Sequence, residues 1–402
     1  MLKHLMLFVL LIIFALPTVA QNTDTDDWTA YLFDTINRDL IRMQSDGSVD
    51  TFILDAPESD YFLSINELTI SNDGETVAYC LKTNENDSIV PHTLVIRDIA
   101  SETTLQEIDL GRQHHCAATA FSQDDSLIAV SIVHYPAFSD KPDDEAIWSL
   151  NAIDAETGET QLMLQSTDDK MPQSTQFEPA LPLMMHVTYF DDETLRFDGI
   201  PFAPMGGPMF VPSFVWDTST DTVTELPLDY GRTNNDYWVE TETLVYPAFD
   251  ESLPAAITDG PMPQANIIQL QDGDNAPETI FATEDWVIMS TTFIDNGEQV
   301  GVLSMRNFDP NIDPALMFSL RVDLVGHNGT VATLDRTFEG QTQIGNITGG
   351  LLIAYTENDP TAPTILYTFD GETLTEVASY LPDYTDGWSP PQLIWVSTST
   401  TE

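Results

Sequence analysis

Thr69-Ile-Ser-Asn-Asp-Gly-Glu-Thr-Val-Ala-Tyr79 is the stretch that decides the fold. It reads as a short apolar strand, a tight Asp-Gly turn and a second apolar strand, which is the pattern of a β-hairpin. Versions of this hairpin recur at intervals of about 40 to 70 residues, as they do in repeat architectures. The recurrence predicts one domain built from similar units.

Six further stretches fit the same pattern when they are aligned on the turn. The close copies are residues 120–130, 188–197 and 292–302, and the weaker copies are 237–246, 344–355 and 387–397. A second kind of hairpin follows every copy except the last, at 94–110, 148–164, 214–228, 267–282, 320–334 and 365–380. Two hairpins make a four-stranded antiparallel sheet, which is the size of one propeller blade.

The two ends of the chain complete each other. Residues 387–397 lack a second hairpin, whereas residues 39–54 form a second hairpin without a first. Pairing them, two strands from each end, would leave no open sheet edge. The sequence therefore predicts an all-β fold, a seven-bladed β-propeller of four-stranded antiparallel blades. Residues 31–34 are a candidate spare strand, and six or eight blades are the alternative counts.

The first 20 residues have the pattern of a secretory signal peptide. A basic start is followed by an apolar run from Leu5 to Leu16 and by small residues up to Ala20. The run is too short to favour a membrane span, so we expect cleavage after Ala20, with an uncleaved anchor as the alternative. The expected domains are a signal peptide, 1–20, and a single propeller, 21–402. We expect a secreted monomer, extracellular or periplasmic, with no membrane span after cleavage.

The chain is strongly acidic. It has 65 Asp and Glu against 13 Lys and Arg, a formal net charge of -52. Nucleic acids and anionic membranes bind through Lys and Arg, so neither is an expected partner. The charge is spread along the chain, which suits salty surroundings or cation binding.

Cys80 and Cys116 are the two cysteines. In an exported protein, such a pair is read as a disulfide bond. Two buried thiols are the alternative.

The repeat resembles the WD40-like repeats of TolB-type β-propellers. Those blades carry a Phe-Ser-Pro-Asp-Gly hairpin followed by Ile-Ala-Phe or Ile-Ala-Tyr, and no copy here holds the whole motif. The resemblance implies the fold and little about activity, because such propellers scaffold proteins, bind peptides or accompany a separate hydrolase domain. The matching residues are Ser71-Asn72-Asp73-Gly74 with Val77-Ala78-Tyr79, Phe121-Ser122-Gln123-Asp124 with Ile128-Ala129, and Trp388-Ser389-Pro390 with Leu393-Ile394.

One face of the expected propeller collects the long connections. Loops from the second strand to the third, and from one blade to the next, emerge together there, and we call it the loop-rich face. The opposite face carries short Asp, Gly and Thr turns, including residues 72–74, and we call it the plain face. Random drift in loop length is the alternative explanation. The long connections are 134–145, 165–183, 198–210, 229–236, 247–264 and 306–315.

Basic and aromatic residues on the loop-rich face are the candidate ligand-binding residues. Arginine can receive a carboxylate or another acidic group, and aromatic residues near strand starts can make contacts. Pairing of each cation with a neighbouring acid is the alternative. The predicted ligand-binding set is Arg112, Arg232, Arg306, Tyr237, Trp238, Trp286 and Trp388; Lys141 and Lys170 map to the same face, and Tyr61, Phe62 and Lys82 lie at the ends of the Thr69 hairpin. Trp148, Trp216 and Trp395 are expected between blades.

The sequence contains none of the common catalytic motifs, so no catalytic residue is assigned. The group His114, His115 and Cys116, with His134 and His186 on nearby blades, matches no established zinc spacing, and we expect no metal site there. No cofactor is expected. Calcium at the Asp-rich turns, or at residues 24–27, is the alternative.

These observations predict an exported, non-catalytic propeller that binds a protein, peptide or small ligand on its loop-rich face. A first alternative is a hydrolase or lyase that acts on a carbohydrate or lactone through carboxylates or a divalent metal at the central channel. A second alternative is a cell-surface structural component whose acidic shell is an adaptation to salt.

Overall fold

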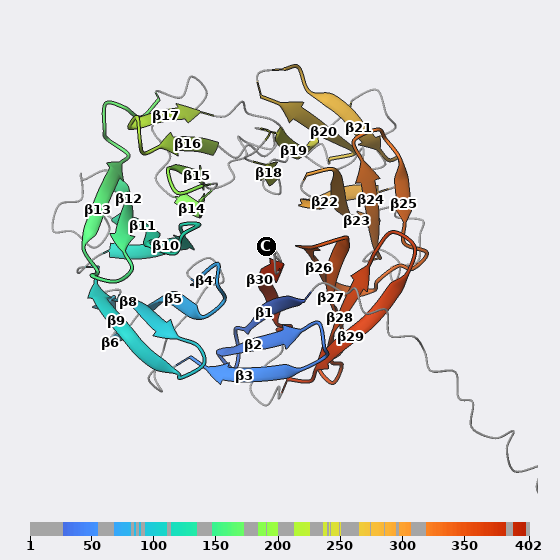
Figure 1. Ribbon diagram of the computed structural model, residues 1–402, viewed down its shortest axis with the longest axis horizontal. Coiled ribbons are helices and arrows are strands. Elements are labelled where there is room, and N and C mark those ends of the chain that lie inside the picture. The colour runs from blue at the N-terminus through green and yellow to red at the C-terminus, as the bar shows by residue number, and fades with distance from the viewer. Residues whose placement is uncertain are drawn as a thin grey trace, which may run out of the picture.

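Short β-strands with buried apolar residues make up the fold (Figure 1). The structure, a computed structural model, describes residues 27–54, 68–81, 84–85, 88–89, 93–110, 114–134, 147–172, 184–189, 191–199, 213–225, 236–238, 241, 243–248, 250, 265–273, 275–284, 286–294, 297–306, 319–382 and 389–398. Seven four-stranded antiparallel sheets stand in a ring, so the protein is a seven-bladed β-propeller, as predicted. In the described part of the chain, no helix is long and apolar enough to cross a membrane.

The blades are numbered around the ring, and their strands are given from the centre outwards. Blade 1 consists of β30 (Gln392–Thr398), β1 (Trp28–Asp34), β2 (Asp39–Gln44) and β3 (Val49–Ile53). Blade 2 consists of β4 (Leu68–Ile70), β5 (Thr76–Leu81), β8 (Thr93–Asp98) and β9 (Thr103–Asp109). Blade 3 consists of β10 (His114–Phe121), β11 (Leu127–His134), β12 (Ile147–Asp154) and β13 (Thr160–Gln165). Blade 4 consists of β14 (Met184–Tyr189), β15 (Thr194–Gly199), β16 (Ser213–Asp217) and β17 (Thr222–Glu225).

The remaining blades follow the same order. Blade 5 consists of β18 (Asp236–Trp238), β19 (Thr243–Ala248), β20 (Ile267–Asp272) and β21 (Glu278–Ala282). Blade 6 consists of β22 (Trp286–Ile294), β23 (Gln299–Arg306), β24 (Leu320–Gly326) and β25 (Val331–Thr333). Blade 7 consists of β26 (Gly340–Ile347), β27 (Gly350–Glu357), β28 (Thr364–Phe369) and β29 (Leu374–Tyr380). A small hairpin, β6 (Asn84–Glu85) and β7 (Ser88–Ile89), lies between β5 and β8 in the chain.

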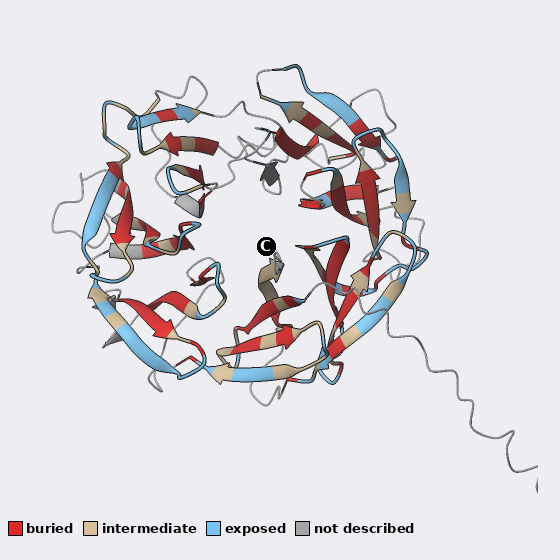
Figure 2. Ribbon diagram, viewed as in Figure 1, coloured by how far each residue is buried: buried red, intermediate tan, exposed pale blue. Residues whose placement is uncertain are grey.

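Burial follows the radius of the ring (Figure 2). The middle strands β5, β19 and β27 are almost wholly buried, whereas the outer strands β3, β9 and β13 are largely exposed. Successive residues of a strand face opposite sides of its sheet, so each middle strand packs against the blade before it and the blade after it. The core therefore lies between blades.

The ring closes through blade 1, where β1 pairs with β30 on one side and with β2 on the other. Three strands of this blade come from the N-terminal end and one from the C-terminal end, so the predicted pairing of two strands from each end is wrong. Residues 31–34 belong to β1, and the described part of residues 387–397 contributes one strand instead of a hairpin. Every residue of β1 except Thr29 is buried, which is why it serves as a second strand.

The recurring Ser-x-Asp signature has a structural role in the turns. Ser71 Oγ donates a hydrogen bond of 2.6 Å to Asp73 Oδ1 and accepts one of 2.8 Å from the Thr76 amide, which closes the β4–β5 hairpin. Ser122 repeats this in the β10–β11 hairpin, with a bond of 2.8 Å to Asp124 Oδ1. Side-chain bonds of this kind stabilise tight turns.

The same turns also join neighbouring blades on the plain face. The Asp125 carboxylate accepts hydrogen bonds from the Asn72 amide at 2.7 Å and from the Asp73 amide at 3.1 Å. Asp192 of blade 4 likewise accepts the Asp124 amide at 3.0 Å. Asp125 has a φ of 58°, in the region that Gly74 occupies in blade 2. An acidic residue stands there because its carboxylate caps the preceding blade.

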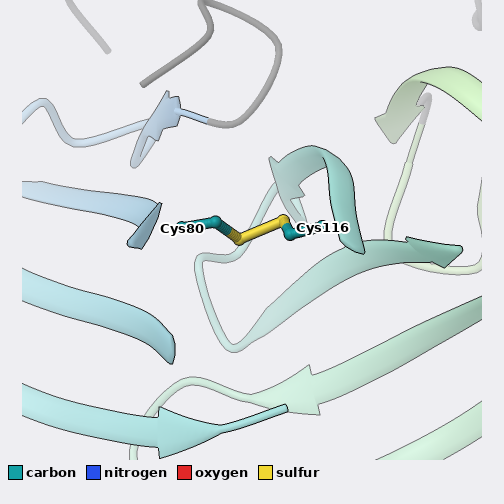
Figure 3. The surroundings of a disulfide bond; sticks show 2 residues. All are labelled: Cys80 and Cys116. Atoms are coloured by element: carbon teal, nitrogen blue, oxygen red, sulfur yellow. A yellow bond between two sulfur atoms is a disulfide. The ribbon is translucent and has the colours of Figure 1, made fainter. Parts of the chain in front are cut away.

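The disulfide between Cys80 and Cys116 is confirmed (Figure 3). It joins β5 of blade 2 to β10 of blade 3, with a Cα–Cα distance of 6.3 Å. Both cysteines are fully buried in a cluster that includes Ala78, Leu94 and Val130. The bond therefore links two blades through their shared core.

Clusters of buried apolar side chains join six of the seven pairs of neighbouring blades. Blades 3 and 4, for example, meet through Trp148 and Phe197, whose ring centroids lie 5.7 Å apart. Within the described residues, no such cluster joins blades 4 and 5, and Leu244, Tyr246, Ala248 and Ile267 of blade 5 form a cluster of their own. This junction is therefore built differently from the others.

A buried ion pair lies on the side of blade 4 that faces blade 5. Leu195 and Phe197 pack towards blade 3, so the alternating residues Arg196 and Asp198 face the opposite way. Arg196 donates two hydrogen bonds of 3.0 Å to Asp198, one to each carboxylate oxygen. Their side chains are only 8% and 11% exposed, so the charges are held in a low-dielectric environment.

Replacing Arg196 with Met should lower the free energy of unfolding by about 3 kcal/mol, because Asp198 would remain buried without its counter-ion. The double variant Arg196→Met/Asp198→Leu should recover most of that loss, since no unpaired charge remains. Urea unfolding followed by tryptophan fluorescence measures both variants. A loss below about 1 kcal/mol for the single variant, the range of surface pairs, would contradict this assignment.

Candidate functional site

Trp286 and Arg306 come together at the loop-rich end of blade 6. Trp286 begins β22 and Arg306 ends β23, and the two are direct partners across the antiparallel pair. Such partners share one side of the sheet, with Cβ atoms about 5 Å apart. Both side chains are half-buried. The structure thus brings together two residues of the predicted ligand-binding set.

Arg321 completes this group from the third strand of the blade. Its guanidinium carbon lies 4.9 Å from the centre of the Trp286 ring and 5.9 Å from that of Phe281, which belongs to β21 of blade 5. A cation over an aromatic face at this distance is attracted by the ring. We call Phe281, Trp286, Ser304, Arg306 and Arg321 the arginine–tryptophan cluster.

Of the two arginines in this cluster, one forms an ion pair and the other forms none among the described residues. Arg321 donates from Nε to Asp323 Oδ2 at 2.7 Å, and the fully buried Asp323 also accepts from Thr333 Oγ1 at 2.6 Å. Arg306, by contrast, makes no ion pair with any residue that the structure describes. One positive charge is therefore uncompensated within the described cluster, although the chain as a whole carries a formal net charge of -52.

Ser304 adds an unused hydroxyl to the cluster. It is the cross-strand partner of Arg321 and, two residues before Arg306 in β23, lies on the same side of the sheet. Its Oγ is buried and has no hydrogen-bond partner in the part of the chain that the structure describes. Most buried polar atoms in proteins are paired, so an unpaired one is a feature to explain.

The cluster has the chemistry of a site for an acidic group beside an apolar surface. A guanidinium presents planar N–H donors that match a carboxylate, and the Trp286 and Phe281 rings offer apolar contact area. Arg321, which is held by Asp323 and by the two rings, fixes the position of Trp286. Arg306 has no carboxylate partner among the described residues.

Sequence reasoning missed Arg321, although a signal was present. In Leu320-Arg-Val-Asp-Leu324, the two charged residues alternate with apolar ones, so they share one side of the strand. Strand order alone did not indicate that this side faces Trp286, because β23 lies between β22 and β24.

Lys170 pairs with a neighbouring acid, which is the alternative that the sequence offered for the basic residues. Its ammonium binds Asp221 in the β16–β17 turn, and Asp221 also accepts the Trp216 indole N–H at 3.1 Å. The Lys170 ammonium lies 5.2 Å from the centre of the Trp216 ring. Lys170 therefore links the segment that follows β13 to blade 4.

The other predicted contact residues are not placed as a group. Tyr237 and Trp238 lie in β18, the innermost strand of blade 5, and only their backbone is described. Outside the described residues lie Arg112, Lys141, Arg232 and Trp388, as do Tyr61, Phe62 and Lys82. Trp148 and Trp216 are buried between blades, as predicted, whereas Trp395 is half-buried.

The histidine–cysteine group shows no metal-binding arrangement in the described chain. Cys116 is bonded to Cys80, which removes its thiolate as a ligand. His114 and His134 are cross-strand partners, but only the backbone of the four histidines is described. Among the described residues, no three His, Cys, Asp or Glu side chains gather as they would around a metal ion.

Solved structures share the fold of this chain, whereas no protein-family model and no curated protein matches its sequence. A prolyl endopeptidase has a TM-score of 0.52 at 12% identity, with 91% of this chain and 54% of the other covered. An acylaminoacyl peptidase of Pyrococcus horikoshii has a TM-score of 0.51 at 13% identity, with 87% and 52% covered. The likeness is one of fold.

The chain spans about half the length of these two peptidases. Hydrazine synthase of Kuenenia stuttgartiensis also matches, with a TM-score of 0.47 at 12% identity and coverage of 79% of this chain and 80% of the other. A likeness of fold alone fixes no activity.

Proposed function

We propose that this chain is an exported propeller of the WD40-like, TolB type that binds, without catalysis, a protein, peptide or small ligand on its loop-rich face. The arginine–tryptophan cluster is the binding site in this proposal, and an acidic group of the ligand meets Arg306. The observation that carries it is the position of Arg306, half-buried beside Trp286 and without an ion pair among the described residues.

The charge balance of the chain supports the role of Arg306. With 65 acidic residues against 13 basic ones, an arginine has many carboxylates that could neutralise it. Arg42, Arg97, Arg196 and Arg321 each pair with an acid. Arg336 also makes no ion pair among the described residues, but its guanidinium lies over the rings of Phe338, Tyr355 and Tyr367. Within the described structure Arg306 has neither an ion pair nor such a ring contact, as expected of a residue kept for a ligand.

An acidic ligand must approach a negatively charged surface, which favours a short-range contact. At physiological ionic strength, exposed charges are screened beyond about 8 Å. Surface carboxylates beyond that distance therefore weaken the binding of an acidic ligand less than the adjacent Arg306 guanidinium strengthens it. The aromatic rings add contact area that does not depend on charge.

The disulfide supports export, because disulfide bonds persist mainly outside the cytoplasm. In this proposal, residues 1–20 direct export and the mature propeller acts as a monomer in an extracellular or periplasmic location. The cavity that the innermost strands of blades 1 to 4 form in the channel has no carboxylate in its described lining.

Arg306→Gln should weaken binding of a tripeptide that ends in phenylalanine with a free carboxylate by about tenfold, because one charge-assisted hydrogen bond is lost. Arg42→Gln is the matched control, since it removes the same charge from β2 of blade 1. Arg321 is unsuitable for this test, because its loss would leave Asp323 buried and unpaired. Calorimetric titration measures the affinities. Equal affinity of the wild type and Arg306→Gln would contradict the proposed site.

A further inference from the structure

The central channel contains a cavity of about 340 Å³ that the proposed binding site does not use. The innermost strands β4, β10, β14 and β30 line it, and they come from blades 1 to 4. Figure 1 shows these strands around the axis of the ring. The cavity is open enough for a small molecule but too small for a folded partner.

Four hydroxyl groups belong to residues that line this cavity. Thr119 and Tyr189 are 6% and 7% exposed, and their hydroxyl oxygens are buried without a hydrogen-bond partner among the described residues. Thr69 and Thr188 line the same cavity and have no side-chain hydrogen bond within the described chain. A buried hydroxyl without a partner destabilises a protein, so two beside one cavity suit a ligand that forms hydrogen bonds.

Apart from Asn72, the rest of the described lining is apolar or aromatic, and none of it carries a charge. Trp395 is half-buried there, so part of its ring is accessible. The centroid of its ring lies 5.5 Å from that of the Tyr31 ring. A sugar combines C–H groups, which pack on an aromatic ring, with hydroxyls that both donate and accept. The lining matches that combination.

Carboxylates in the adjacent turns select against an anion. The innermost strands of blades 2, 3 and 4 run directly into turns that carry Asp73, Asp124 and Asp192. Hydrogen bonds from Ser126 lower the pKa of Asp124, so this carboxylate is ionised at neutral pH. Burial, aided by Asp124 and Asp192, raises the pKa of Tyr189, which therefore keeps its proton and can donate it in a hydrogen bond.

We propose that the central channel binds an uncharged polyhydroxylated molecule of hexose size, held by the hydroxyls of Thr69, Thr119, Thr188 and Tyr189 and by the Trp395 ring. The volume of about 340 Å³ accommodates one hexose with room for water. The hydroxyls of Thr119 and Tyr189 are covered in the free protein, so their side chains must shift slightly to meet the sugar. Binding at this site involves no bond breaking and is independent of Arg306.

Calorimetric titration with glucose, and with glucuronate as its anionic counterpart, tests the proposal. We expect a dissociation constant for glucose on the order of 1 mM, because a ligand of few atoms binds weakly. Glucuronate should bind at least about tenfold more weakly, because its carboxylate meets the acidic turns. The double variant Thr119→Val/Thr188→Val should weaken glucose binding about tenfold, since two hydrogen bonds are lost.

Two further variants separate binding from folding. Thr375→Val, on the exposed outer strand β29, should bind glucose as the wild type does. Tyr189→Phe should weaken glucose binding without lowering the melting temperature, because it removes only an unpaired buried hydroxyl. The absence of saturable glucose binding up to about 100 mM would overturn the proposal. Equal binding of glucuronate, or unchanged binding by Thr119→Val/Thr188→Val, would overturn it as well.

Discussion

Truncation of the chain before Gln392 should abolish cooperative folding, because it removes β30 and opens the ring. Strand β1 would lose the partner that pairs with it from Trp28 to Phe33. Leu393 and Val396 pack on the core between blades 1 and 7, and Trp395 packs on the core between blades 1 and 2, so both junctions would lose apolar contacts. The newly exposed edge of β1 would also promote aggregation.

Truncation after Thr398 provides the matched control. It shortens the same end of the chain but keeps every residue that pairs with β1, so we expect it to fold like the full-length protein. Circular dichroism on heating and size-exclusion chromatography compare the two proteins. If the protein that lacks β30 is monomeric and melts like the control, then β30 does not close the ring as the fourth strand of blade 1.

Loss of the disulfide should lower the free energy of unfolding by about 4 kcal/mol, the value expected from loop closure over the 36 residues that separate Cys80 from Cys116. The double variant Cys80→Ala/Cys116→Ala tests this effect in chemical unfolding. Both side chains are fully buried between blades 2 and 3, so the smaller alanines add a packing cost to the entropic one.

The wild-type protein under reducing conditions separates these two contributions. Reduction breaks the bond but keeps both sulfur atoms, so it should retain most of the packing while losing the cross-link. Thiol titration of the unfolded, unreduced protein should detect almost no free thiol. Detection of two thiols, or the same unfolding midpoint with and without reductant, would contradict the structural role of the bond.

Most of the ring was predictable from the sequence, because each blade repeats one local pattern. The Thr69 hairpin pairs as expected, with Thr69 opposite Ala78 and Ile70 opposite Val77. Its signature recurs because Ser71 and Asp73 close the turn, a local effect that sequence spacing records. Blade count and the pairing of Cys80 with Cys116 followed from the repeats and from the expected export.

The closure and part of the candidate site were not predictable in the same way. Strand β1 lacks the turn signature, since its partner β30 is supplied by the opposite end of the chain. The contact of Arg321 with Trp286 crosses an intervening strand and depends on the packing of blade 6 against blade 5. Periodicity indicates which side of a strand a residue occupies, but long-range packing decides what that side meets.

The binding of an acidic group by Arg306 is tested by comparing two peptides on two proteins. The tripeptide ending in phenylalanine is titrated into the wild type and into Arg306→Gln, once with a free C-terminal carboxylate and once amidated. For the wild type, we expect the carboxylate form to bind about tenfold more tightly, whereas Arg306→Gln should bind both forms alike. A preference for the carboxylate that survives in Arg306→Gln, or none in the wild type, would contradict the claim.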